Sequence, residues 1–367
     1  MRDAIAVVNA GSSSLRYCLF AIDDEALTLI SKDHVEATGG HDAAVRQFLG
    51  TLDAAQESLR VVAVGHRVVH GGTRHSSPVI VDAALLDELQ ALVPLAPLHQ
   101  PHNIAPIRKL REVTPDLLQV ACFDTAFHRT QSPLAQAFAL PPSIVDRGVR
   151  RYGFHGLSCE YIASALPSID ASAARGRVVI AHLGNGASLC ALRDGKSVAS
   201  TMGLTALDGL MMGTRCGALD PGVILYLMNT LGMEARSIET LLYHESGLLG
   251  VSQLSSDMRA LESSSDPRAR FAIELFCYRA IRELGSLVAA LGGLDALVFT
   301  AGIGENSSHV RAAIVDGAAW LGMKLDAKAN ASHALRITTA DSALPAYVIA
   351  TNEELVIARH ARSLLDV

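Results

Sequence analysis

The chain has 367 residues, half of them hydrophobic, and a formal net charge of −6 at pH 7. This length predicts two domains with sizeable cores, and the negative charge argues against general nucleic-acid binding without excluding a nucleotide site. No apolar run reaches the roughly 18 residues of a membrane helix, and Met1-Arg2-Asp3 leads straight into a predicted strand, so no signal peptide is expected.

The first predicted element is a hairpin of two short strands. Ile5–Val8 and Tyr17–Phe20 are apolar runs, and Asn9–Ser14 (NAGSSS) lies between them. A glycine lets the backbone approach a ligand closely, and three serines offer hydroxyl groups in one turn. The segment is therefore a candidate ligand loop.

Residues 1–150 continue as an alternation of strands and helices. Val61–Gly72 is predicted as a buried strand with a polar exit, and Leu117–Asp124 as a strand that ends in a carboxylate. Asp82–Leu92 has apolar residues at helical spacing. Prolines 94, 97, 101 and 106 predict an irregular loop that leads into a helix.

From about residue 147 the pattern restarts. Strands are predicted at 178–181 and 189–192, around a glycine turn at 182–186, and helices at about 221–231 and 267–291. A strand at 297–300 then leads into a predicted small-residue loop, 301–306. The last strand, 346–350, precedes a helix at 355–365 that Thr351 or Asn352 would cap.

Three apolar strands thus end in small-residue loops, which together indicate a phosphate cradle, although one such loop alone would usually be an ordinary turn. None matches a P-loop or a Rossmann glycine motif. The hairpins at 5–20 and 178–192 look like two copies of one unit. We therefore expect an α/β fold of two similar lobes with an interlobe cleft, and ligands at the carboxyl ends of strands.

Six cysteines are scattered along the chain, without a C-x-x-C pair. Most lie in apolar runs, where a buried thiol is the usual outcome. We expect a reduced, cytoplasmic protein without structural zinc.

On its motifs the chain resembles the acetate kinases, which have the duplicated actin/sugar-kinase/Hsp70 (ribonuclease H-like) fold. The resemblance covers essentially the whole chain. The segments that carry it are Asn9–Arg16, HRVVHGG at 66–72, PLHQPHN at 97–103, FDTAFH at 123–128, RYGFHG at 151–156, HLGNG at 182–186, Thr201–Pro221, Asp257–Arg259, GIGEN at 302–306 and TNEE at 351–354.

The resemblance implies a lobe of residues 1–146 plus 353–367 that holds acetate and Mg²⁺, and a nucleotide-binding lobe of residues 147–352. It also implies a homodimer. The reaction would be reversible transfer of the ATP γ-phosphoryl group to acetate, giving acetyl phosphate and ADP, with Mg²⁺ as the metal and Mn²⁺ as its alternative. Acetate is ionised at pH 7, so the enzyme needs no strong base and instead needs cations that bring two anions together.

The resemblance assigns roles to four residues that meet this need. Arg67 would clamp the acetate carboxylate, because a planar guanidinium can grip two oxygens; a structural salt bridge is the alternative. Arg215 would contact the moving phosphoryl group, and His155 would stabilise the transition state. We expect Asp124 to orient Arg67 or the substrate rather than to abstract a proton; its alternative is an ordinary strand-end cap.

Further positions follow from the resemblance. Asn9 and Glu353 would hold magnesium, although Glu353 could equally serve only the dipole of its helix. His99 and His182 are weaker candidates for polar support of the site. The apolar pocket for the substrate methyl would comprise Val69, Leu98, Phe154 and Ala206. The nucleotide set would comprise Ser12, Arg16, His182, Leu183, Gly184, Asn185, Gly186, Asp257, Met258, Arg259, Gly302, Ile303, Gly304, Glu305 and Asn306, with Asp257 accepting from sugar hydroxyls and Arg259 stacking on the base.

The chain departs from the family pattern at two positions. Arg16 stands where the family usually has Lys, and Ala206 stands where it usually has Pro. The chain is also shorter than is usual in the family, and the missing length falls between Phe20 and Val61. The change at Ala206 leaves acetate and propionate both open as the preferred substrate.

Two other functions share this fold. One is a nucleotide-driven switch protein that hydrolyses ATP slowly, which would not need two arginines directed at an acceptor carboxylate. The other is a sugar kinase, in which Asp124 would act as the base for a hydroxyl, but the arginines suit an anion better.

Overall fold

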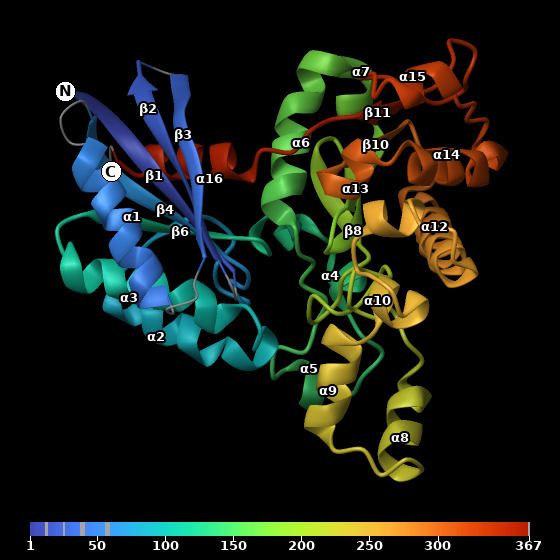
Figure 1. Cartoon of the computed structure of the whole chain (residues 1–367), viewed down its shortest axis with the longest axis horizontal. Coiled ribbons are helices and arrows are strands. Elements are labelled where there is room, and N and C mark those ends of the chain that lie inside the picture. The colour runs from blue at the N-terminus through green and yellow to red at the C-terminus, as the bar shows by residue number, and fades with distance from the viewer. Residues whose placement is uncertain (12–13, 25, 37–40, 56–58, 366–367) are drawn as a thin grey trace. The chain divides into compact units, whose positions relative to one another are not determined.

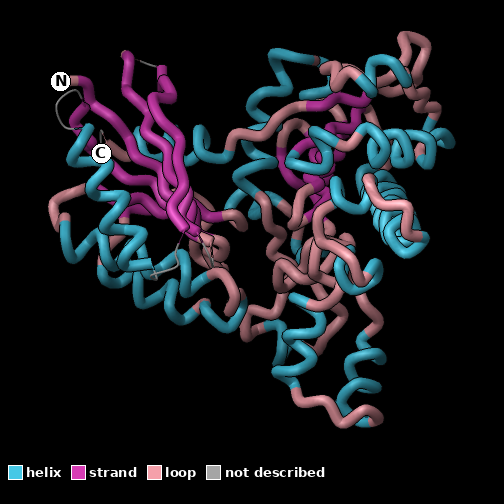
Figure 2. The backbone as a smooth tube through the Cα atoms, in the orientation of Figure 1, coloured by secondary structure: helices cyan, strands magenta, loops and turns pink. Residues whose placement is uncertain are grey.

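The structure is a computed structural model that describes residues 1–11, 14–24, 26–36, 41–55 and 59–365. The chain divides into two compact units. The first comprises Met1–Arg129, Gly156–Tyr161 and Asn352–Val367, and the second comprises Thr130–His155 and Ile162–Thr351. Figure 1 labels many of their helices and strands, and Figure 2 shows that both units combine a sheet with helices.

The first unit is built on a mixed sheet. Its strands are β1 (Arg2–Ala10), β2 (Ser14–Asp23), β3 (Ala26–Glu36), β4 (Leu59–Val68), β5 (Val79–Ile80) and β6 (Leu118–Phe123). Its helices are α1 (His41–Ala55), α2 (Ala83–Ala91), η1 (Val93–Leu95), α3 (Gln100–Val113) and α16 (Glu353–Ser363), and η2 (Ala126–Thr130) follows β6.

The strand order in this sheet is β3-β2-β1-β4-β6-β5. β1 pairs antiparallel with β2 and parallel with β4, and β4 pairs parallel with β6. Strands β1, β4 and β6 run parallel, so their carboxyl ends lie at the same end of the sheet. Asn9, Arg67 and Asp124 all lie at that end.

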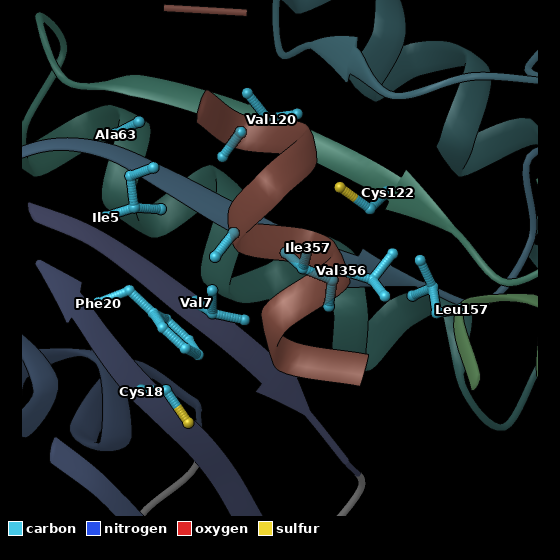
Figure 3. Close-up of a cluster of buried hydrophobic side chains, with 12 residues drawn as sticks. Ile5, Val7, Cys18, Phe20, Ala63, Val120, Cys122, Leu157, Val356 and Ile357 are labelled. Atoms are coloured by element: carbon cyan, nitrogen blue, oxygen red, sulfur yellow. The ribbon is translucent and has the colours of Figure 1, made fainter. Parts of the chain in front are cut away.

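Apolar side chains cover both faces of this sheet. Figure 3 shows Val356 and Ile357 of α16 against strand residues such as Ile5 and Val120 on one face. On the opposite face, residues of α1 such as Phe48 pack with a second buried cluster. Burial of an apolar side chain of this size contributes about 1.5–3 kcal/mol, so the sheet is a firm base for the polar residues at its edge.

The second unit has its own sheet. Its strands are β7 (Arg177–Leu183), β8 (Ala187–Arg193), β9 (Lys196–Ser200), β10 (Ala296–Thr300) and β11 (Ala346–Val348). The other helices of the chain are α4 (Pro133–Gln136), α5 (Pro142–Val145), α6 (Gly156–Ile169), α7 (Ala171–Ala174), α8 (Pro221–Asn229), α9 (Ala235–His244), α10 (Gly247–Ser252), α11 (Met258–Glu262), α12 (Pro267–Leu291), α13 (Ala301–Asn306), α14 (Ser308–Gly317), η3 (Ala319–Leu321) and α15 (Ala327–Ala331).

The second sheet repeats the topology of the first. Its order is β11-β10-β7-β8-β9, in which β7, β8 and β9 form an antiparallel meander and β10 and β11 add parallel strands beyond β7. The same order, β6-β4-β1-β2-β3, runs through the first sheet. The predicted α/β fold with two copies of one unit is thus confirmed.

The prediction was wrong at two segments. Residues 301–306, predicted as a loop, form the short helix α13, which Ala301 enters with a positive φ of 65°. The proline-rich segment becomes helical earlier than expected, because Pro101 lies in the first turn of α3, where no backbone donor is needed. Pro106 is accommodated within the same helix.

The capping prediction at the last helix was correct for Asn352, whose side chain accepts from the backbone N–H of Leu355 at 3.0 Å. All six cysteines lie among the described residues, and none of them takes part in a disulfide. Among the helices of the described ranges, none has the length and apolar character to cross a lipid bilayer.

Candidate active site

Arg67 and Asp124 form the polar centre of the first unit. The Arg67 Nη2 donates to Asp124 Oδ2 at 2.6 Å, and Arg67 Nε donates to both carboxylate oxygens at 3.1 and 3.2 Å. The Asp124 side chain is 2% exposed and that of Arg67 is 22% exposed. The buried carboxylate therefore fixes one side of a guanidinium that still reaches solvent.

Asn9 and Glu353 lie beside the same guanidinium. Arg67 Nη1 donates to Asn9 Oδ1 at 3.4 Å, and Arg67 Nε lies 3.8 Å from Glu353 Oε2. Burial disfavours the charge on Arg67, but the carboxylates of Asp124 and Glu353 outweigh this effect, so the pKa of Arg67 is raised above its usual value. The guanidinium therefore stays charged at neutral pH.

The backbone of Asp124 is anchored on both sides. Its N–H donates to the carbonyl of Val68 at 3.0 Å, and its own carbonyl accepts from the N–H of Gly156 at 2.9 Å. A Cβ at Gly156 would collide with that carbonyl, so only glycine permits this approach.

Gln100 and Asn103, which the sequence did not single out as site residues, hold the segment after β4. The side chain of Asn103 accepts from the N–H of Val69 at 3.0 Å and donates to the carbonyl of Ala10 at 2.9 Å. Gln100 both accepts from and donates to the backbone of His70. Both lie in the motif PLHQPHN at 97–103, whose run of polar residues between prolines was the available signal.

In the second unit, His155 stacks on His182 with ring centroids 4.1 Å apart. His155 adopts a left-handed backbone conformation with φ of 56°, and its Nδ1 lies 3.0 Å from Ser188 Oγ. A non-glycine residue in this region is strained, and such strain is concentrated at functional sites. The hydroxyl and the stacked ring fix the imidazole plane.

Arg215 shares the surroundings of His155. A Cβ placed on Gly186 would lie 3.0 Å from His155 Nε2 and 3.7 Å from Arg215 Nη2. The structure thus brings two predicted catalytic side chains together beside the backbone of Gly186. Arg215 Nη1 also donates to the carbonyl of Ala206 at 2.7 Å.

The loop that carries Arg215 is bound to its neighbours through the backbone. Gly213 donates to the carbonyl of Asn185 at 3.0 Å, and the N–H of Ser246 donates to the carbonyl of Thr214 at 3.0 Å. The first bond links the predicted catalytic loop to the glycine turn after β7, and the second links it to the residue that precedes α10.

The predicted apolar positions fall in both units. Val69 is 6% exposed and Leu98 is half-buried in the first unit. In the second unit, Phe154 is 1% exposed and Ala206 is half-buried. Phe154 is therefore a core side chain as well as a candidate pocket residue.

A cavity of about 640 Å³ lies in the second unit, within the range of small-molecule sites. Eight predicted nucleotide residues line it: Gly184, Asn185, Asp257, Met258, Arg259, Gly302, Ile303 and Asn306. Ser256, Glu262 and Ser307 line it as well. These three were missed because single serines and a glutamate in polar segments give no recognisable pattern.

Five other predicted nucleotide residues do not line this cavity. Leu183 is fully buried, and Gly304 packs against the backbone of strands β7 and β10. Glu305 binds backbone N–H groups of its own unit. His182 and Gly186 lie beside His155.

Asp257 and Arg259 are paired with each other. Arg259 Nη2 donates to Asp257 Oδ2 at 2.6 Å, and Asp257 Oδ1 accepts from the N–H of Arg259 at 2.9 Å. These bonds from Arg259 lower the pKa of Asp257. In the first unit Arg16 is exposed on β2 opposite Asn9, and Ser12 lies outside the described residues.

Comparisons with known proteins agree with these motifs. The Acetokinase family matches residues 28–359 of the chain. The chain belongs to this family. It is 51% identical to an acetate kinase of Rhodopseudomonas palustris (strain TIE-1) over 399 aligned positions, which cover 100% of this chain and 99% of that protein.

Solved structures show the same fold over the full length. A propionate kinase from Francisella tularensis is 36% identical with a TM-score of 0.90, covering 99% of this chain and 100% of its own. An acetate kinase from Porphyromonas gingivalis is 34% identical with a TM-score of 0.88, at the same coverage. The family membership therefore extends to the whole architecture.

Proposed function

We propose that this protein is an acetate kinase, which transfers the γ-phosphoryl group of ATP to acetate and runs the reaction in both directions. The observation that carries the proposal is the guanidinium of Arg67 in a chain of the acetokinase family. The buried Asp124 fixes this group, and the Arg67 side chain is still 22% exposed. Such a group suits a small carboxylate, because its planar fork can donate two parallel hydrogen bonds.

The Asp124 carboxylate accepts hydrogen bonds from Nε and from Nη2 of Arg67. Acetate would accept from the remaining N–H groups on Nη1 and Nη2. Because the acetate is already ionised, its oxygen can attack phosphorus without a base. The role of Asp124 is then to orient Arg67, which agrees with its three contacts to that side chain.

Arg215 and His155 would act on the phosphoryl group. Charge builds on its oxygens during transfer, and fixed cationic or N–H donors stabilise that charge. The convergence of Arg215 Nη2 and His155 Nε2 beside Gly186 supports this assignment. The cavity lined by Gly184, Gly302 and Ile303 has the size for the nucleotide.

Asn9 and Glu353 would help to hold Mg²⁺. The donor set fits, because an amide oxygen and a carboxylate are hard ligands, and magnesium usually keeps water and phosphate oxygens as its other ligands. Arg67, Asp124 and Glu353 together carry one net negative charge, which favours an added cation. The metal would neutralise charge on the transferred phosphoryl group.

These assignments give the two predicted lobes separate tasks. Residues 1–146 with 353–367 would bind acetate and magnesium, and residues 147–352 would bind the nucleotide. The six reduced cysteines support a cytoplasmic location.

We further propose that a second copy of the chain covers α8. This helix is apolar yet contains no buried residue. Its exposed side chains include Val223, Leu225, Tyr226 and Met228, at 38–58%. An apolar surface of this kind marks an interaction site, and a symmetric homodimer is the commonest form of oligomer among soluble proteins.

A hydroxamate assay tests the proposed activity. With ATP, Mg²⁺ and acetate, the protein should form acetyl phosphate, which hydroxylamine traps, and omission of acetate should abolish the signal. ADP release that does not depend on acetate would instead indicate a slow ATPase. The reverse assay, in which acetyl phosphate and ADP yield ATP, should also proceed.

Propionate is the second candidate substrate. Ala206 stands in the predicted acyl pocket, and its carbonyl accepts from Arg215, so residue 206 lies close to a catalytic side chain. A single methyl group there leaves more space than a proline ring. Rates with both acids decide between them.

A further inference from the structure

The carboxylate of Glu305 connects the ends of two parallel strands in the second unit. Its Oε1 accepts from the N–H of Ala301 at 2.8 Å and from the N–H of Thr351 at 3.1 Å. Thr300 Oγ1 lies at 3.5 Å from the same atom. Ala301 follows β10 and Thr351 lies three residues beyond β11, so one oxygen joins two segments that are 50 positions apart in sequence.

The first of these segments opens the helix that borders the nucleotide cavity. Gly302, Ile303 and Asn306 of α13 line that cavity, and Ala301 enters the helix at a φ of 65°. A β-carbon disfavours this conformation, by roughly 1–2 kcal/mol. The charge-assisted hydrogen bond from Ala301 to Glu305 offsets this cost and fixes where α13 begins.

The second segment leads to the proposed magnesium residue. Thr351 is the last residue of the second unit, and the chain enters the first unit at Asn352. Asn352 caps α16, and Glu353 is the next residue. Thr351 thus directly precedes the cap of α16 and lies two residues before Glu353.

The backbone of Glu305 is itself held in place. Its carbonyl accepts from Arg311 Nη1 at 2.8 Å, and His333 Nδ1 lies 3.1 Å away. The Arg311 side chain is fully buried and also donates to Asn330 Oδ1 at 2.8 Å. The Glu305 carboxylate thus extends from a backbone that is held in place, and it joins the start of α13 to Thr351.

We propose that Glu305 is a positioning residue that couples nucleotide binding at α13 to the placement of Glu353. It does not touch the nucleotide cavity. Through its carboxylate, the presence of nucleotide in the cavity would affect the backbone at the start of α16. The inference rests on the proposed function through the role of Glu353 in binding magnesium.

Hydrogen–deuterium exchange with ADP tests the coupling without any turnover. In the native protein, saturating ADP should slow exchange in residues 301–307 and also in residues 349–356. In Glu305→Ala, ADP should still protect 301–307, but protection of 349–356 should be lost. Glu305→Gln keeps an acceptor oxygen, so ADP should recover part of the protection of residues 349–356 in this variant.

Glu262→Ala is the matched control. Glu262 lines the same cavity, and its carboxylate accepts from Ser307 Oγ, whereas that of Glu305 accepts from Ala301 and Thr351. It should weaken ADP binding and leave the protection of 349–356 intact at saturating ADP. Kinetics should agree: Glu305→Ala should raise the Mg²⁺ concentration for half-maximal rate roughly tenfold, as expected for loss of a charged hydrogen-bond acceptor, with little change in the KM for acetate.

Two results would overturn the coupling. Either ADP fails to protect 349–356 in the native protein, or it protects this segment equally in native protein and in Glu305→Ala. If Glu305→Ala does not fold, the comparison of native protein with Glu305→Gln decides, because full protection with full magnesium affinity in that variant would exclude a role for the charge. Failure of the native protein to form acetyl phosphate would contradict the proposed function but leave the exchange result valid.

Discussion

A double-mutant cycle on Arg67 and Asp124 separates an orienting role from a catalytic one. Arg67→Ala leaves the Asp124 carboxylate, whose side chain is 2% exposed, without its main partner. Breaking such a pair costs about 3 kcal/mol, at the low end for buried pairs because Arg67 is partly exposed. For a unit of this size, that lowers the unfolding midpoint by roughly 6–12 °C.

The double variant Arg67→Ala/Asp124→Asn should be more stable than Arg67→Ala alone, because it no longer buries a carboxylate that has lost its main cationic partner. Its kcat/KM for acetate should equal that of Arg67→Ala within about threefold, since Asp124 acts through Arg67 and contacts in one network are not additive. Thermal unfolding by circular dichroism and initial rates of acetyl phosphate formation give both quantities. A double variant that is less stable than Arg67→Ala, or that loses a further large factor in rate, would refute the orienting role.

Three further predictions address magnesium, the acyl group and assembly. Glu353→Gln should raise the Mg²⁺ requirement while the protein stays folded; an unchanged magnesium titration would return Glu353 to a helix-capping role. In a folded Ala206→Pro variant, the ratio of kcat/KM for propionate to that for acetate should fall, because one methylene in an apolar pocket contributes roughly 1–3 kcal/mol of discrimination; an unchanged ratio would remove Ala206 from the pocket. Leu225→Glu should convert a dimer to a monomer in analytical ultracentrifugation, whereas Arg236→Glu, a charge reversal on the neighbouring helix α9, should not; a dimer that persists in Leu225→Glu would place the interface elsewhere.

Much of the sheet architecture could be predicted because each strand is a short apolar run that ends in polar residues. Asp124 directly follows β6 and Asn9 lies near the end of β1, as the sequence indicated. Parallel neighbours place such residues at one edge. The meeting of Arg67 with Asp124 needed the strand order as well, and that order depends on contacts between distant segments.

Helix α13 could not be predicted from its composition. Glycines and a polar end are typical of loops, and the helix forms because tertiary contacts hold it: Glu305 binds the N–H of Ala301 at one end, and Arg311 binds carbonyls at the other. The resemblance assigned Glu305 to the nucleotide, whereas its side chain is directed to the backbone of its own unit. Asp257 and Arg259 are only two positions apart in sequence, and their side chains bind each other.

Separate kinetic effects of the two arginines are the most direct test of the account. Arg67→Ala should strongly raise the KM for acetate, because it removes ground-state binding of the carboxylate. Arg215→Ala should chiefly lower kcat, on the order of 10²–10³-fold, because its charge matters most as the phosphoryl group moves. If both variants are folded and both keep the native kcat and KM within about threefold, the assigned active site is wrong.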